Sequence, residues 1–504
     1  MNLDLLLINP PSRARTYQVL AQDFAAIEPP VWAGLMATFA RKRGCSVEIL
    51  DGEALGLSLE ATAKLVVERR PVLAAIVVYG QQPSASTQMM PAAGALCRAI
   101  KAAAPDQKLL LLGGHVAALP GRTLLEEPVD FTAGGEGLET LVDLVAALKA
   151  GGQDLDKVPD LYQRSDGGVL APSRRAQLVT DLDGQMPGMA WDLLPMGHYR
   201  AHNWHCMGIL DSHGELDRQP YASVYTSLGC PFRCSFCCIQ APFKSGEQER
   251  GMKVGTNSYR LWSPKGVVDG LEFLASHHGV RNVKFADEMF VMNRSHVEGI
   301  CDLILERGLD LNIWAYARVD TVRDGMLDKL KRAGFNWLAL GIESARSEVR
   351  DDVQKGYSQQ DIFRTLAGIR AAGIHVIGNY IFGLPEDSLE SMEATLDLAM
   401  ELNCEFANFY SAMAYPGSHL YQLAVERGWR LPGTWGGYSQ HAVDTLPLPT
   451  RYMSGEEVLR FRDQAFTRYF THPAYLEMVE LRFGPDTAAH IRQMTTHRLE
   501  RQHD

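Results

Sequence analysis

Two series of short apolar segments, each alternating with segments of helical periodicity, constrain the fold of this chain most. The first series runs over residues 1–148 and the second over 221–427. Because strands that alternate with helices pack as parallel sheets covered by helices, each series predicts an α/β unit. We expect a doubly wound, Rossmann-like sheet from the first. The second offers six strand candidates, which predicts a partial (β/α)6 barrel of the TIM type and not the closed eight-stranded form.

Two further segments have a different character. Residues 149–220 are rich in glycine and proline and are interpreted as a linker with small strands. Residues 428–504 begin as a loop and then become helical, so we expect a small helical cap. The cap contains aromatic and basic side chains, most of which we expect to pack in its core.

Composition excludes several classes of protein. The chain has 504 residues and a formal net charge of −11, which argues against a general nucleic-acid binder. Its longest apolar runs, such as Val72–Tyr79, have the length of strands and are too short for a membrane span. The first residues lack the features of a signal peptide. We therefore expect a cytoplasmic protein with no membrane span and no nucleic-acid partner.

Four of the nine cysteines lie within nine residues, directly after a predicted strand. Cys230, Cys234 and Cys237 follow a C-x-x-x-C-x-x-C spacing, and Cys238 comes next. Thiolates are the ligands of iron–sulfur clusters, and three of them around one cube leave one iron open. A zinc knuckle is the first alternative, although it normally needs a fourth ligand at matching spacing. Buried apolar cysteines are the second alternative.

This loop, with Phe236 before its third cysteine, resembles that of the radical S-adenosylmethionine (radical SAM) superfamily. The resemblance covers residues 221–425 and implies a [4Fe–4S] cluster held by Cys230, Cys234 and Cys237. In such enzymes the open iron binds the amine and carboxylate of S-adenosylmethionine, and its reductive cleavage yields a 5′-deoxyadenosyl radical. The cofactors carry that chemistry, and the protein orients them and excludes water.

Further residues match the superfamily by their positions at the carboxyl ends of predicted strands. Asp287 and Glu288 would accept hydrogen bonds from the methionyl amine, unless they belong to a solvated turn. Arg318 would hold the carboxylate, or would instead pair with Asp320. The remaining candidates, which would contact the ribose, carboxylate or adenosine or would simply form turns, are Glu343, Ser344, Gly383 and Pro385.

The first unit resembles the cobalamin-binding domain fused to many radical SAM enzymes. The resemblance rests on five segments in this order: Asn9-Pro-Pro, Glu28-Pro-Pro, Leu50-Asp-Gly-Glu-Ala, Gly113-Gly-His and Gly134-Gly-Glu-Gly. It implies contacts to the corrin or its nucleotide tail from Gln81, Ser84, Gly113, Gly114, His115 and Gly135. The Asp-x-His-x-x-Gly motif of mutase-type domains is missing, so no histidine is assigned to cobalt. A domain with this fold and no cofactor is the alternative.

Together the two resemblances imply a class B radical SAM methyltransferase. Such an enzyme would methylate an unactivated carbon of a small molecule or natural product through a 5′-deoxyadenosyl radical and methylcobalamin. An electron donor such as flavodoxin or ferredoxin would be its partner. The alternatives are a cyclase or ring-rearranging enzyme with the same cofactors, a tRNA methylthiotransferase-like enzyme, and a non-catalytic cobalamin sensor. General acid and base residues and the substrate are not assigned.

Overall fold

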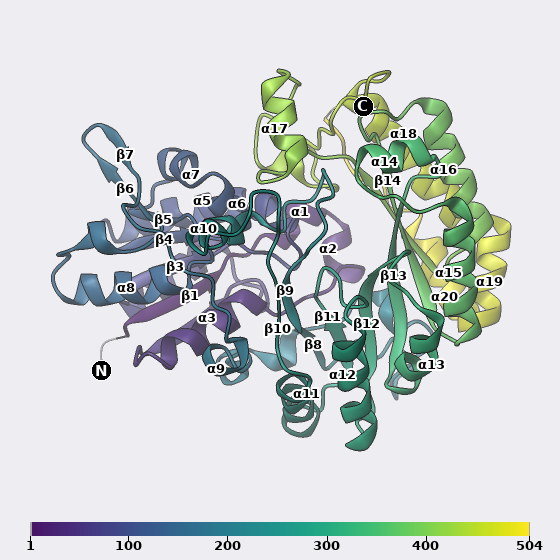
Figure 1. Cartoon of the computed structure of the whole chain (residues 1–504), viewed down its shortest axis with the longest axis horizontal. Helices are drawn as coiled ribbons and strands as arrows, with labels where there is room; N and C mark the ends of the chain where they lie inside the picture. Colours follow the sequence, from purple (N-terminus) through teal and green to yellow (C-terminus); the bar gives the residue numbers. More distant parts are fainter. Residues whose placement is uncertain (1–2, 503–504) are drawn as a thin grey trace.

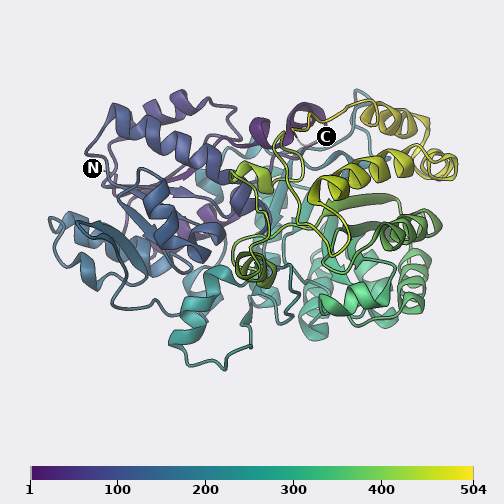
Figure 2. The ribbon, with the colours of Figure 1, turned by 90° about the horizontal axis from the view of Figure 1, so that it is seen from above.

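A computed structural model describes residues 3–502 of the chain. Two α/β units lie side by side in it, as Figure 1 and Figure 2 show. The first unit is drawn in purple and blue and the second mainly in green. The C-terminal helices, in yellow, cover the outer side of the second unit. Within these residues no helix is long and apolar enough to cross a membrane.

The first unit is built on a seven-stranded sheet in the order β2-β1-β3-β4-β5-β6-β7. Its first five strands are parallel, and the last two form an antiparallel hairpin at the edge. The predicted linker thus contributes two strands to this sheet, while the domain boundaries stay a prediction. The strands are β1 (Leu5–Asn9), β2 (Val47–Asp51), β3 (Leu73–Val77), β4 (Leu109–Leu112), β5 (Phe131–Ala133), β6 (Leu161–Ser165) and β7 (Gly168–Leu170).

Helices cover both faces of this sheet because its strands are apolar on both. Along β1, Leu5 and Leu7 pack with α3 (Val31–Arg41) and α8 (Leu138–Lys149). Leu6 and Ile8 point the other way and pack with α4 and α5. The doubly wound sheet is therefore confirmed. The other helices of this unit are α1 (Arg13–Tyr17), α2 (Leu20–Asp23), α4 (Leu59–Arg69), α5 (Ala85–Ala103), α6 (Gly114–Ala118) and α7 (Pro120–Glu126).

The second unit is a sheet of six parallel strands in the order β8-β11-β12-β13-β14-β15. Because β8 and β15 are its two edges, the sheet is a half-barrel, as six strand candidates predicted. The strands are β8 (Tyr221–Val224), β11 (Asn282–Phe285), β12 (Asn312–Arg318), β13 (Phe335–Glu343), β14 (His375–Phe382) and β15 (Phe406–Ser411). Its helices are α11 (Pro264–His278), α12 (Arg294–Glu306), α13 (Asp324–Arg332), α14 (Ser347–Asp352), α15 (Gln359–Ala371) and α16 (Leu389–Leu402).

The first predicted barrel strand, Ala222–Ser227, differs from the structure. The pairing of β8 stops at Val224, and Ser227 begins a separate strand, β9 (Ser227–Gly229), which pairs with β10 (Tyr259–Leu261). The carboxylate of Asp287 accepts hydrogen bonds from the amide of Thr226 at 3.0 and 3.1 Å. That contact takes the backbone out of the sheet and starts the cysteine loop. Two short helices also belong to this middle region, α9 (Leu182–Gln185) and α10 (Lys244–Glu249).

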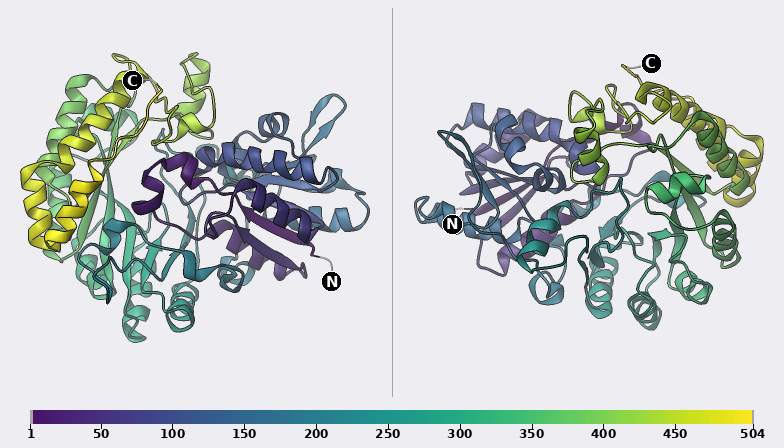
Figure 3. Two further views of the ribbon diagram at one scale, coloured as in Figure 1. Left: turned by 180° about the vertical axis from the view of Figure 1, so that it is seen from behind. Right: turned by 45° about the horizontal axis from the view of Figure 1, so that its top comes forward.

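The C-terminal segment closes the half-barrel from outside. After α17 (His419–Glu426), a loop leads to α18 (Gly455–Phe470), α19 (Pro473–Phe483) and α20 (Pro485–Met494), so the predicted helical cap is confirmed. Val458 and Ala465 of α18 are fully buried in the same core as the barrel strands. Figure 3 shows the segment with α1 and α2, in purple, reaching from the first unit towards these helices. There the Gln18 side chain donates to the carbonyl of His441 at 2.6 Å.

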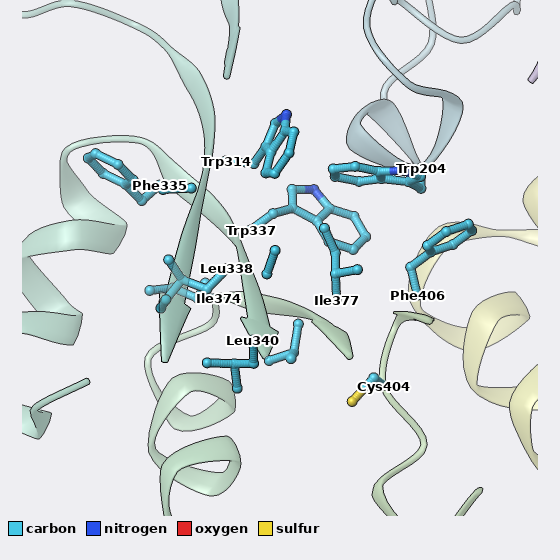
Figure 4. Packing of buried hydrophobic residues seen from close by; sticks show 14 of the residues in the cluster. Trp204, Trp314, Phe335, Trp337, Leu338, Leu340, Ile374, Ile377, Cys404 and Phe406 are labelled. Carbon is cyan, nitrogen blue, oxygen red and sulfur yellow. The ribbon is translucent and has the colours of Figure 1, made fainter. Parts of the chain in front are cut away.

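The linker also fills the amino-terminal end of the barrel. Trp204 lies beside Trp314 and Trp337 (Figure 4), with ring centroids 5.1 and 5.6 Å away. Phe406 of β15 completes this aromatic group at 5.9 Å. Large aromatic side chains bury much apolar surface, so the linker stabilises the barrel as well as connecting the units.

A buried ion pair joins the two units. Lys284 of β11 donates to both carboxylate oxygens of Glu28, at 3.2 and 2.9 Å, and to the carbonyl of Gln81 at 2.9 Å. The two side chains are 2% and 7% exposed. Burial raises the pKa of Glu28, but Lys284 and His202 outweigh it and hold this pKa at about 2. A second buried pair, Arg260 with Glu136 at 2.7 Å, lies between β10 and the loop before α8.

Replacing Lys284 by methionine is expected to destabilise the protein by about 3 kcal/mol at pH 7.5, because the Glu28 charge is left buried and unpaired. The pKa of Glu28 lies below its ordinary 4.5, so the pair contributes stability above pH 4.5 and loses it as the pH falls towards 2. Melting temperatures of the variant and the parent should therefore differ strongly at pH 7.5 and still at pH 5, and should converge only as the pH falls from 4.5 towards 2. The control is Arg346→Met, which breaks an exposed pair with Glu390 and should change stability by about 0.5 kcal/mol or less. Equal melting of the Lys284 variant and the parent at pH 7.5 would contradict the role of the pair.

Candidate active site

The cysteine loop has a fixed start. Gly229 has φ +87°, and a Cβ there would lie 2.2 Å from the carbonyl oxygen of Ser258. The amide of Cys230 donates to the Gln240 side chain at 3.2 Å. Asn257 donates to the carbonyl oxygens of Cys230 and Phe232 at 3.0 and 2.7 Å. The fold of this loop therefore depends on polar side chains further along the chain.

The three predicted cluster ligands lie in this loop with different exposure. Cys230 is buried, and Cys234 and Cys237 are half-buried. Burial raises the pKa of Cys230 to about 11 and that of Cys237 well above its ordinary value, with Cys234 adding to both. Among residues 3–502, no three His, Cys, Asp or Glu side chains converge as they would around a single metal ion. Three thiols at this spacing in one loop suit a group larger than a single ion, such as a cluster.

A cavity of about 1070 Å³ opens beside the cysteine loop, at the carboxyl ends of the barrel strands. We call it the cofactor cavity. The loop contributes Phe236, Cys237 and Cys238, and the first unit contributes residues 82–84, which follow β3. Gln440 of the C-terminal segment completes the wall. All three parts of the chain therefore meet at this cavity.

The two predicted acidic residues after β11 have different roles. The Asp287 carboxylate is fully buried and accepts hydrogen bonds from Thr226 and Ser227, so it organises the backbone between β8 and β9. The cofactor cavity is lined by Glu288, whose Oε1 is buried and has no hydrogen-bond partner in the part of the chain that the structure describes. Burial raises the pKa of Glu288 to about 8, although Lys284 opposes the shift. Glu288 is therefore the acidic group available to a ligand in the cavity.

Both interpretations of Arg318 fit the structure. Its Nε and Nη2 form a forked pair with Asp320 at 2.9 and 3.0 Å, and its Nη1 donates to Cys234 Sγ at 3.5 Å. The guanidinium lies 3.9 Å from the ring centroid of Phe232. Arg318 also lines the cofactor cavity. Its positive charge thus lies between the cysteine loop and the space that a ligand would fill.

Glu343 lies at a bulge where β13 ends. Its φ is +64°, and its carboxylate pairs with Lys355 at 2.7 Å. Gly341 makes room for the pair, since a Cβ there would lie 2.6 Å from the Glu343 carboxylate. Both Glu343 and Lys355 line the cofactor cavity. Sequence reasoning missed Lys355 because it lies in a loop between two helices, with no periodic pattern around it.

Three predicted residues do not line the cofactor cavity. The Ser344 hydroxyl lies 3.2 Å from the Thr395 hydroxyl in the core. Gly383 has φ +81° and packs against Val458, and its amide donates to Asp387 at 3.0 Å. The carbonyl of Pro385 accepts from the amide of Arg451 at 2.9 Å. Ser344 follows β13, whereas Gly383 and Pro385 form the turn after β14 and its contact with the cap.

The candidates in the first unit are distributed over neighbouring spaces. Ser84 lines the cofactor cavity, and Gln81 donates to the Tyr17 hydroxyl at 2.7 Å. Gly113 has φ +150°, and a Cβ there would lie 2.4 Å from the carbonyl oxygen of Val78. Gly114 lines a smaller cavity of about 430 Å³ that shares Glu288 and Cys238 with the cofactor cavity. Glycine at Gly114 therefore leaves room at a cavity wall.

His115 is buried under the C-terminal segment. Its Nδ1 lies 3.2 Å from the Thr87 hydroxyl, and its Nε2 has no partner among residues 3–502. Its ring makes an edge contact with Trp435 at 4.4 Å between centroids. Burial lowers the pKa of His115 to about 3, so the ring is neutral. Gly135, in contrast, is explained by packing, because a Cβ there would lie 2.5 Å from the Asp160 carboxylate.

The sequence is similar to those of known proteins. Residues 224–399 match the family model described as the radical SAM superfamily. The chain is 27% identical to an uncharacterized methyltransferase of Pyrococcus horikoshii, over 94% of each protein. It is also 27% identical to an anaerobic magnesium-protoporphyrin IX monomethyl ester cyclase of Cereibacter sphaeroides, over 79% of this chain and 61% of the relative.

A solved structure shares the fold of nearly the whole chain. It is the cobalamin-dependent S-adenosylmethionine radical enzyme OxsB, with aqua-cobalamin and S-adenosylmethionine bound. The TM-score is 0.70, with 15% identity, over 98% of this chain and 71% of that one. The likeness supports the arrangement of both units, since a match at this identity concerns the fold.

Replacing Glu288 by glutamine is expected to stabilise the protein at high pH. The folded-state pKa of about 8 lies above the ordinary 4.5, so the native state loses stability as the pH rises from 4.5 through 8. A neutral amide removes this cost, which is on the order of 1 to 4 kcal/mol at pH 8.5. Before iron loading, the variant should melt above the parent at pH 8.5 and level with it at pH 5. Glu390→Gln, at an exposed carboxylate, is the control. Matching curves at pH 8.5 would show that the Glu288 site is not desolvated.

Proposed function

We propose that the chain, whose residues 224–399 match the radical SAM superfamily model, is a cobalamin-dependent radical SAM enzyme that methylates an unactivated carbon of a small molecule. The observation that carries the proposal is the cofactor cavity. It brings the cysteine loop, the carboxyl ends of the barrel strands and the loop after β3 of the first unit to one space. Enzymes on barrel-like sheets and on doubly wound sheets both place their sites at this end of the strands.

Cys230, Cys234 and Cys237 would hold a [4Fe–4S] cluster. When the cluster and S-adenosylmethionine are bound, they supply the radical chemistry. The hydrogen bond from Arg318 to Cys234 places a positive charge beside one of the proposed ligand sulfurs. Pro231 and Arg233 lie within the loop and are exposed, which supports electron entry from a carrier such as flavodoxin or ferredoxin.

Charged residues around the cofactor cavity match the amino-acid part of S-adenosylmethionine. The unpartnered Oε1 of Glu288 suits the ammonium group, and a charge-assisted hydrogen bond would replace its missing partner. Arg318 and Lys355 suit the carboxylate, and each already has one acidic partner that fixes its position. Tyr316 and Tyr410 line the same cavity, and burial raises the pKa of both hydroxyls, so they stay neutral and help to exclude bulk water.

Cobalamin would bind between the first unit and the cofactor cavity. When bound, it supplies the methyl group. Residues 82–84, Gly114 and the unpartnered Nε2 of His115 are the features of this chain that fit it. The whole-chain likeness to a cobalamin-dependent enzyme supports this assignment. We further propose a cytoplasmic enzyme without a nucleic-acid partner, divided as the sequence predicted at residues 148, 220 and 427.

Cofactor loading tests the proposal directly. Anaerobic reconstitution with iron, sulfide and hydroxocobalamin should give about four irons and one cobalamin per chain after desalting. The triple variant Cys230→Ala/Cys234→Ala/Cys237→Ala should lose the iron and its visible absorbance but keep the cobalamin. Cys238→Ala is the matched control, since this neighbouring buried thiol is not a proposed ligand, and its iron content should equal that of the parent. Iron without cobalamin in the parent would withdraw the cobalamin part of the proposal.

The relative from Cereibacter sphaeroides supports a second candidate, a radical SAM cyclase or ring-rearranging enzyme with the same cofactors. The coproducts separate the two. Methylation consumes S-adenosylmethionine both as radical source and as methyl donor, so 5′-deoxyadenosine and S-adenosylhomocysteine should form in equal amounts with product. Cyclisation or rearrangement would give 5′-deoxyadenosine without S-adenosylhomocysteine. Chromatography of a turnover mixture with the true substrate measures both.

A further inference from the structure

A second, deeper cavity adjoins the cofactor cavity inside the half-barrel. We call it the aromatic chamber because Trp204, Trp314, Tyr316, Phe406 and Phe409 form much of its wall. It shares wall residues with the cofactor cavity, namely Gln82, Tyr316, Ala339 and Tyr410. Because the two cavities share these residues, a molecule in the aromatic chamber would lie directly beside a ligand in the cofactor cavity.

Strand β12 shows how far the aromatic chamber extends from the cofactor cavity. Side chains alternate along a strand, so Trp314, Tyr316 and Arg318 all face the lumen. Arg318 lines the cofactor cavity, Tyr316 lines both spaces, and Trp314 lines the aromatic chamber. Four residues at the rise of a strand separate Arg318 from Trp314 by about 13 Å. The chamber is thus an elongated extension of the cofactor cavity towards the amino ends of the strands.

The charges in the aromatic chamber largely cancel. Lys284 and Glu28 neutralise each other in their buried pair. Burial, with Arg462 and Arg501 nearby, lowers the pKa of His441 to about 3, so its ring carries no charge. The indole N–H of Trp314 is buried and has no acceptor among residues 3–502. The chamber therefore suits a flat, apolar body that offers a hydrogen-bond acceptor.

A third cavity, of about 1480 Å³, continues from the aromatic chamber into the C-terminal cap. The two share Leu20, His441, Arg462, Phe466 and Met494. Among residues 3–502, five arginines and one carboxylate, Asp463, lie in the wall of this arginine cavity, although the whole chain has a net charge of −11. The arginines are Arg460, Arg462, Arg468, Arg498 and Arg501.

Most of this positive charge is not neutralised within the cavity wall. Asp463 pairs with Arg462 at 2.7 Å and with Arg501 at 2.9 Å, so one carboxylate serves two guanidinium groups. Arg468 pairs at 2.9 Å with Glu393, which lies outside the wall. Arg460 and Arg498 are exposed at the outer side. The Nε2 of His497, in the same wall, is buried and has no partner among residues 3–502. Such a surplus of donors attracts an anionic group.

We propose that the aromatic chamber and the arginine cavity together bind the methyl acceptor, an amphiphile with a flat apolar body and one anionic end. The body lies in the aromatic chamber, and the arginines hold the carboxylate or phosphate. The reacting carbon then lies at the end of the body remote from the anion, where Tyr316 and Tyr410 border the cofactor cavity. The identification of this ligand as the methyl acceptor rests on the proposed function. The binding of such an amphiphile does not depend on that function.

Three matched probes test the site by isothermal titration calorimetry on oxidised, cluster-loaded protein without reductant. They are naphthylbutanoate, naphthylbutyl phosphate and the uncharged naphthylbutanol. We expect at least one anion to bind about tenfold more tightly than the alcohol, and this preference to shrink as salt is added. The better anion identifies the group that the arginines prefer. Equal affinity of all three probes, or no binding of any, would overturn the proposal.

Two sets of variants separate the parts of the site. Arg460→Gln/Arg498→Gln should weaken the anion about tenfold and leave the alcohol unchanged. Arg294→Gln/Arg332→Gln removes the same charge from exposed helices and should change neither. Trp314→Leu should weaken all probes alike, and Trp429→Leu, outside the chamber, should not. Equal losses of anion affinity in both arginine pairs would show that only net charge matters.

The outcomes remain distinct from those of the cofactor experiment. If the probes fail while iron and cobalamin load, the proposed function stands and this site does not. If cobalamin fails to load while the anionic probes bind as expected, the amphiphile site stands and the methylation proposal is withdrawn.

Discussion

Six parallel strands curve around a lumen but leave β8 and β15 as edges, so other parts of the chain have to wall that lumen. The first unit supplies the loop after β3, the linker supplies Trp204, and the cap supplies Arg462 and Gln440. A closed barrel would fill its interior with strand side chains. Here the open edge makes room for cavities whose walls come from every part of the chain, and this is why cofactor and ligand spaces can adjoin.

The chemical character of the side chains that face the lumen changes along the strands. At the carboxyl ends lie thiols, Glu288 and Arg318, which suit a cluster and a charged amino acid. Deeper along β12 the side chains are aromatic, and beyond the edge strand they are cationic. Because lumen-facing positions alternate along each strand, a few residues per strand set this order. Cofactor binding, binding of the apolar body of the ligand and recognition of its anionic end would thus take place in three adjoining cavities of one fold.

The sequence predicted the two sheets, the six barrel strands and the helical cap because apolar periodicity reports on burial. It also predicted Glu288 and Arg318, since both follow strands whose carboxyl ends form the cavity. Lys355 and Trp204 lie in irregular segments, and their roles depend on contacts with distant residues. The different roles of Asp287 and Glu288 could not be predicted for the same reason. The two adjacent acids look alike in the sequence, and only the hydrogen bonds of Asp287 show that it organises the backbone. Ser344, Gly383 and Pro385 likewise end strands but face the core or the cap.

The contact of Lys284 with the Gln81 carbonyl has a consequence for how such a chain tolerates change. It ties the loop that borders the cofactor cavity directly to a barrel strand. The alignment of the two units is therefore set by contacts through space as well as by the linker, which packs against both units. Insertions or deletions at the exposed tip of the β6–β7 hairpin should leave the spacing of the two halves of the catalytic centre intact. Shortening or lengthening the Lys284 side chain by one methylene would instead change the spacing that its contact with the Gln81 carbonyl sets.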